Sequence, residues 1–98
     1  MDMRLMMKQA QKMQEKLQKE IAEMKVEASA GGGMVTVVVN GNKQIQSLKI
    51  DPDVVSKDDV QMLQNLIVAA NNDAARNVDQ ELSKQMGGLM GGLKIPGL

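Results

Sequence analysis

The chain contains no cysteine, no histidine and no aromatic residue, and each absence excludes a class of function. Without cysteine there is no disulfide framework, no thiolate nucleophile and no zinc finger. Without histidine there is no Ser-His-Asp arrangement and no imidazole ligand for a metal. Without aromatic side chains there is no stacking platform for unpaired bases, which disfavours a protein that binds single strands.

Long apolar runs and a secretory leader pattern are also missing. No apolar run approaches the roughly 20 residues that a membrane-spanning helix needs. The N-terminus lacks the cationic and then apolar pattern of a secretory signal. We therefore expect a cytoplasmic protein that has no membrane partner.

The motifs that most resemble ligand sites are incomplete. Gly31-Gly32-Gly33 lacks the Gly-Lys-Ser/Thr ending of a phosphate-binding loop, so a turn explains it better. The aspartates lack the glycine and terminal glutamate of a calcium loop, and helix capping accounts for the last two; they are Asp51, Asp53, Asp58 and Asp59. No carboxylate pair has an acid–base setting. We expect no enzyme, no metal, no cofactor and no small-molecule substrate.

Charge is balanced in total but unevenly distributed. The 98 residues include 12 basic and 12 acidic side chains, for a formal net charge of zero. Residues 3–19, however, hold five basic side chains and only one acid, Glu15. A chain of this length forms one domain at most and has little core of its own, so oligomerisation would help to stabilise it.

The basic residues near the start follow a helical period. They recur every fourth residue as Arg4, Lys8, Lys12 and Lys16, with Lys19 close by. An apolar row has the spacing of a helix seam: Met3, Met6, Ala10, Met13, Leu17 and Met24. A helix over residues 3–26 would be roughly 35 Å long, more than a small sheet can cover. We expect part of it to project, with its apolar row against another molecule and its cations toward an anion.

The remaining segments predict strands and a second helix. Residues 26–30, 34–39 and 44–50 read as three antiparallel strands, with Asn40-Gly41 as a hairpin in which both residues tolerate positive φ. Ile45 is out of phase with Leu48 and Ile50, which a β-bulge or burial of both faces in a dimer would resolve. A capping box of Ser56 and Asp59 opens a helix that ends near residue 86.

The predicted fold class is therefore α+β, in the order α-β-β-β-α, with helices on one face of the sheet. Residues 1–86 form one domain, and the glycine- and methionine-containing residues 87–98 form a flexible tail. The methionines are expected mainly as core and seam filling, although they could also form an adaptable binding surface.

The basic row has two interpretations. Most lysine-rich helix faces are simply solvated. This row, however, has few interleaved acids and lies where the helix is least able to pack on its own domain. Lysines suit phosphates better than base edges, so the row favours sequence-independent binding of DNA. Arg76, on the second helix, could add a phosphate contact or be solvated.

Several segments resemble, in order and spacing, the YbaB/EbfC family of bacterial nucleoid-associated proteins. They are residues 7–16 (MKQAQKMQEK), 30–35 (AGGGMV), Val37, Val39, Asn40-Gly41, Ile50-Asp51-Pro52, Met62-Leu63, Ala69-Ala70 and 72–76 (NDAAR). The resemblance implies a homodimer with a shared β core and projecting helices, which binds DNA, alters its conformation, associates with the nucleoid and influences gene expression. It implies no catalytic residues.

We therefore predict a homodimer that binds double-stranded DNA. The expected DNA contacts are Arg4, Lys8, Lys12, Lys16, Lys19 and Arg76. The expected dimer interface is Met6, Ala10, Met13, Leu17, Val35, Val37 and Val39. The alternative is a dimeric helical adaptor that grips another protein and does not bind DNA, in which case the lysines only confer solubility.

Overall fold

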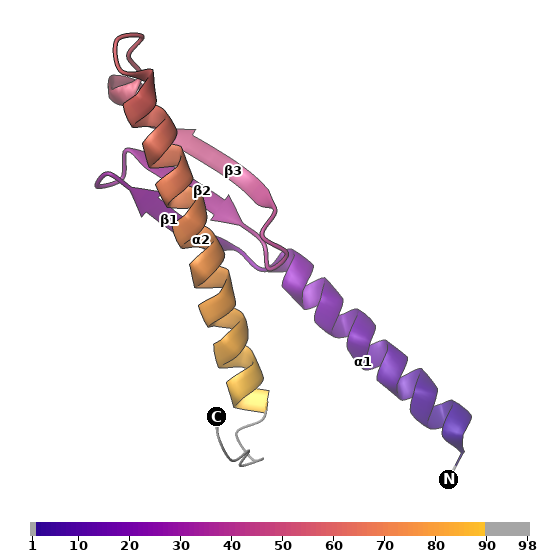
Figure 1. The fold of residues 1–98 in the computed structure, drawn as a ribbon. Helices are drawn as coiled ribbons and strands as arrows, with labels where there is room; N and C mark the ends of the chain where they lie inside the picture. Colours follow the sequence, from indigo (N-terminus) through magenta and orange to yellow (C-terminus); the bar gives the residue numbers. More distant parts are fainter. Residues whose placement is uncertain (1, 90–98) are drawn as a thin grey trace.

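The fold was analysed in a computed structural model that describes residues 2–89. The elements follow the predicted α-β-β-β-α order (Figure 1). They are α1 (Met3–Glu23), β1 (Val26–Ala30), β2 (Val35–Val39), β3 (Ile45–Ile50), a short 3-10 helix η1 (Pro52–Val54) and α2 (Val60–Leu89).

Helix α1 begins at a capping residue and ends earlier than expected. The Asp2 side chain accepts a hydrogen bond of 3.0 Å from the Arg4 N–H, which satisfies a free donor of the first turn. The helix ends at Glu23 rather than near Val26, because Met24 has extended backbone angles and Val26 already belongs to β1. No residue of α1 is buried.

The three strands form an antiparallel sheet in the order β1-β2-β3. Gly31, Gly32 and Gly33 all have positive φ in the turn between β1 and β2, which confirms the turn interpretation of this triplet. Between β2 and β3, Val38 pairs with Ser47 whereas Val39 pairs with Ile45, so Gln46 is an extra residue.

This irregularity is the β-bulge that the sequence offered as one of two explanations for the phase of Ile45. Residues paired directly across two strands share a face of the sheet. Ile45, Leu48 and Ile50 pair with Val39, Val37 and Val35, so all three lie on the same face as the buried valines of β2.

Helix α2 covers only part of this face. Its buried residues are Ala70, Ala74 and Val78, which contact the core valines and Ala28 of β1. Four partly buried side chains extend this apolar face of α2, namely Leu63, Leu66, Ile67 and Leu82, whereas Val60 at the start of the helix is exposed. A helix about 10 Å wide covers about two strands spaced about 4.8 Å apart. In agreement, α2 packs on β1 and β2 and leaves β3 beside it (Figure 1).

The turn between β2 and β3 differs from the tight hairpin that Asn40-Gly41 suggested. The positive φ belongs to Lys43 (64°), and neither Asn40 nor Gly41 has one. The buried Asn40 side chain accepts hydrogen bonds from the N–H groups of Asn42 and Gln44, both 2.9 Å, and donates one to Gln44 Oε1 at 2.8 Å. One asparagine thus organises the whole turn over residues 40–44.

The start and end of α2 also differ from the expectation. The cap is Asp59, whose carboxylate accepts the Met62 N–H at 3.1 Å, and the helix begins at Val60. Ser56 accepts the Asp58 N–H in the preceding turn instead of opening the helix. At the other end the helix continues through Gly87 to Leu89. The rest of the expected tail, residues 90–98, lies outside the described residues.

The protomer is elongated because α1 leaves the sheet. Its radius of gyration is 19.0 Å and its extents are 69 × 29 × 15 Å. A compact domain of this length has a radius of gyration of about 13 Å. Figure 1 shows α1 running away from the sheet to a distant N-terminus, as the sequence predicted for a helix too long for its own domain.

Candidate nucleic-acid interface

The predicted cations of α1 form an exposed row on the projecting helix. Arg4, Lys8, Lys12, Lys16 and Lys19 are all exposed. Residues four apart recur about every 6 Å along a helix. The ion pairs among residues 2–89 join Lys43 to Asp79 and Arg76 to Asp73, and neither includes a residue of α1. The row therefore presents five cations that form no ion pair within the described chain, with Glu15 as the one carboxylate among them.

The apolar row of the same helix is exposed as well. Met6, Met13 and Leu17 are 52%, 71% and 40% exposed, and Ala10 lies between them on the same side. At about 100° per residue, this row and the basic row lie on roughly opposite sides of the helix. The apolar row can therefore be covered by a partner while the basic row stays open.

Arg76 lies elsewhere and already has a partner. It projects from α2, is exposed, and forms an ion pair with Asp73 one turn earlier. An arginine that shares its charge with a neighbouring carboxylate attracts a phosphate less strongly than an unpaired lysine. The structure thus separates this residue from the cations of α1 both in position and in charge.

The predicted interface valines lie inside the protomer. Val35, Val37 and Val39 are at most 1% exposed, because their side chains point toward α2. They have no surface left for a second chain. The exposed apolar residues of the sheet are instead Ile45 (55%) and Leu48 (44%) on β3. The predicted interface did not include this pair, although the phase shift at Ile45 was a signal in the sequence that pointed to it.

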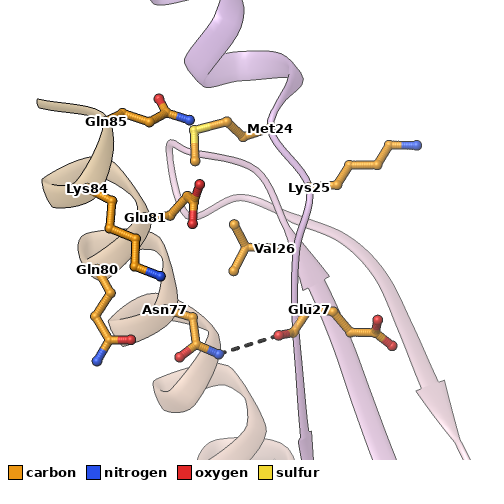
Figure 2. A pocket seen from close by; sticks show the side chains of 9 residues that line it. All are labelled: Met24, Lys25, Val26, Glu27, Asn77, Gln80, Glu81, Lys84 and Gln85. Atoms are coloured by element: carbon orange, nitrogen blue, oxygen red, sulfur yellow. Dashed lines mark hydrogen bonds between the residues drawn. The ribbon is translucent and has the colours of Figure 1, made fainter. Parts of the chain in front are cut away.

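An open hollow of about 500 Å³ lies between the start of β1 and the later half of α2 (Figure 2). Asn77 Nδ2 donates to the Glu27 carbonyl oxygen across it at 3.4 Å. Lys84 and Glu81 line it from α2, whereas Lys25 and the Glu27 carboxylate point away from α2 in Figure 2. Charges of both signs at an open surface define no particular ligand.

Neither a metal site nor a membrane-spanning helix is found among residues 2–89. Residues 2–89 contain no group of three or more acidic residues arranged to hold a metal ion. None of the helices described there combines the length and the apolar character needed to cross a membrane.

The chain is similar to proteins that are named nucleoid-associated proteins. A nucleoid-associated protein of Thermoanaerobacter pseudethanolicus is 52% identical over 96 residues, which cover 95% of this chain and 86% of that protein. One of Clostridium novyi is 52% identical over 101 residues, covering 100% and 89%. The crystal structure of an uncharacterized Helicobacter pylori protein, HP0035, has the same fold, with a TM-score of 0.73 at 22% identity over 92% of this chain and 98% of that one.

The family itself is identified by a match over almost the whole length. The model of the YbaB/EbfC DNA-binding family matches residues 1–93, which include the projecting helix, the sheet and α2. This match and the relatives above confirm the resemblance found in the sequence. The chain is a member of the YbaB/EbfC DNA-binding family.

Proposed function

We propose that two copies of this chain bind double-stranded DNA through the basic rows of their α1 helices, without catalysing a reaction. The observation that carries the proposal is a projecting helix with no buried residue, apolar on one side and cationic on the other. The names of the relatives support association with the nucleoid.

The dimer is proposed from apolar surface that the protomer leaves uncovered. This surface consists of the apolar row of α1 (Met6, Ala10, Met13, Leu17) and the β3 pair (Ile45, Leu48). Full burial of a Leu, Ile or Met side chain contributes roughly 1.5–3 kcal/mol. The five large side chains of this surface are 40–71% exposed, so their burial in both copies recovers about half of that gain, roughly 8–15 kcal/mol in all, against an association cost of roughly 4–15 kcal/mol.

DNA is the proposed partner because the cations are concentrated and unpaired. Arg4 and Lys19 are separated by about 22 Å along the helix axis, a length over which duplex DNA carries about a dozen phosphates. Contacts of this kind release counterions and give binding that weakens steeply with salt and depends little on sequence. The zero net charge of the whole chain does not oppose these phosphate contacts. The electrostatic field close to the basic row is determined mainly by the cations of the row itself.

A change in DNA conformation is part of the proposal. A straight duplex contacts both rows along their whole length only if the two rows of the dimer lie along its path. Bending of the duplex toward the rows adds phosphate contacts, which offset a deformation cost of roughly 1–6 kcal/mol for a site of 20–30 base pairs.

The test is a salt series of duplex binding with two matched triple variants. Lys8, Lys12 and Lys16 are replaced by Gln in one variant; Lys25, Lys57 and Lys84, which are exposed outside α1, are replaced by Gln in the other. The α1 variant loses up to six contacts per dimer, so the slope of log affinity against log salt falls by up to about 5. The control variant keeps nearly the slope of the unsubstituted protein.

The same series distinguishes the adaptor alternative. Unsubstituted protein that ignores duplex DNA even at low salt, while remaining dimeric by light scattering, would support a protein–protein adaptor. Equal slopes in the two triple variants would show that the DNA contacts lie outside α1.

A further inference from the structure

The direction in which α1 presents its basic row is set where the helix joins the rest of the domain. Among the hydrogen bonds of residues 2–89, one connects α1 to the rest of the fold: the Gly41 N–H donates to the Ile21 carbonyl oxygen at 2.8 Å. Ile21 is the only half-buried residue of α1, while the others are exposed. The direction of the helix thus depends on a very small contact.

Gly41 permits this contact through its lack of a side chain. A Cβ atom built at position 41 would lie 2.5 Å from the Ile21 carbonyl oxygen, 2.6 Å from Ile21 Cγ2 and 2.9 Å from Met24 Sδ. The oxygen belongs to the backbone, so relief of the clash requires movement of the helix end or of the turn. The positive-φ glycines are Gly31, Gly32 and Gly33, so alanine at position 41 brings a steric conflict without backbone strain.

The turn that carries Gly41 is itself rigidly held. Asn40 is 3% exposed, and its side chain makes three hydrogen bonds within residues 40–44. On the other side of Gly41, Lys43 forms an ion pair of 3.0 Å with Asp79 of α2. The turn therefore contacts both long helices, at the end of α1 and in the middle of α2.

We propose that the β2–β3 turn fixes the direction of α1 through its contact with Ile21, and that Gly41 is the positioning residue for the DNA-binding row. This contact between the turn and the end of α1 is called the seat of the helix below. The proposal rests on the proposed function, because the direction of α1 matters only if the cations on it meet an extended partner. With the seat intact, the cations of α1 are presented along one line relative to the sheet. A side chain at position 41 pushes the helix end off the seat and turns that line away from the duplex.

The test compares Gly41→Ala with Gly87→Ala in the full chain. Gly87 is a suitable control, because a Cβ built there meets nothing within 4 Å. The chain has no cysteine, so spin labels attach only at introduced Gln9→Cys on α1 and Gln64→Cys on α2. Dilution with an excess of unlabelled protein leaves one labelled chain per dimer. Double electron–electron resonance then reports the distance between the labels at positions 9 and 64 of the same chain.

The expected result for Gly41→Ala is a shifted or broadened distance distribution together with duplex binding weakened at least threefold and a smaller salt slope. Circular dichroism and dimer mass stay those of the unsubstituted protein. Gly87→Ala leaves distance, affinity and slope unchanged. An unchanged distance in Gly41→Ala overturns the proposal, and so does a changed distance with unchanged DNA binding.

Two further measurements distinguish failure of the proposed function from failure of the proposed role of Gly41. Failure of the unsubstituted protein to bind duplex at low salt would contradict the proposed function, whereas the distance measurement alone still tests the seat. If Gly41→Ala does not fold, hydrogen exchange of the Gly41 amide in the unsubstituted protein decides. Slow exchange is expected for a donor seated on Ile21, and exchange at the intrinsic rate of a free amide overturns the proposal.

Discussion

The two long helices of this chain, α1 with 21 residues and α2 with 30, differ in how much of their surface the rest of the chain covers. Helix α2 buries Ala70, Ala74 and Val78 against the sheet, and their small size brings the helix close to β1 and β2. Helix α1 buries nothing and leaves methionine and leucine exposed on one side. The comparison indicates that α2 completes the fold of the chain, whereas α1 leaves surface uncovered, which the proposed function assigns to a second copy and to DNA.

The largest expected effect comes from one substitution made in both helices. Ala74→Asp places an unpaired carboxylate in a fully buried position, which costs several kcal/mol and prevents folding. Ala10→Asp places the same charge on the exposed apolar row of α1, so the sheet and α2 stay folded while the dimer dissociates. Circular dichroism and light scattering check the pair. If both variants unfold, or if both remain folded dimers, the two helices do not have the different roles described here.

A smaller effect is expected from truncating two residues that pair across β2 and β3. Val37→Ala removes a fully buried side chain and lowers the free energy of unfolding by about 2 kcal/mol at any protein concentration. Leu48→Ala lies on the same face but beyond the cover of α2, so its cost arises mainly from dimerisation. Thermal unfolding at several concentrations separates them. A melting temperature of Leu48→Ala that equals that of the unsubstituted protein at every concentration would exclude β3 from the interface.

The smallest effect is expected at the two helix caps. Asp59→Ala removes the acceptor of the Met62 N–H and lowers the free energy of unfolding by about 1 kcal/mol, since α2 is part of the core. Asp2→Ala removes the corresponding acceptor of the Arg4 N–H but frays only the free end of α1. Urea unfolding checks the first, and amide exchange in residues 3–6 checks the second. Equal losses of global stability would mean that the tip of α1 is packed as firmly as α2.

Local patterns in the sequence were sufficient to predict the helices and strands, and to predict that the cations of α1 share one face. The spacing of Lys8, Lys12 and Lys16 requires only that the segment be helical, so their common face follows without knowledge of the fold. The phase shift at Ile45 likewise left a bulge or burial of both faces as its explanations, and the register shows the bulge.

Contacts between elements that are distant in the sequence could not be predicted from such patterns. That Val35, Val37 and Val39 are covered within the protomer, while Leu48 is not, depends on the width and path of α2 across the sheet. The importance of Gly41 is also tertiary, because Asn-Gly signals a turn but does not show that a helix end is seated on it. The DNA contacts themselves remain predictions.

The central claim is that opposite sides of α1 meet different molecules, and two neighbouring probe positions test it directly. The introduced residues are Glu15→Cys, within the basic row, and Met13→Cys, within the apolar row, each carrying a photo-crosslinker in this otherwise cysteine-free chain. Irradiation of the complex with duplex DNA is expected to join position 15 to DNA and position 13 to a second copy. Equal crosslinking of both positions to DNA, or the reverse pattern, would contradict the account.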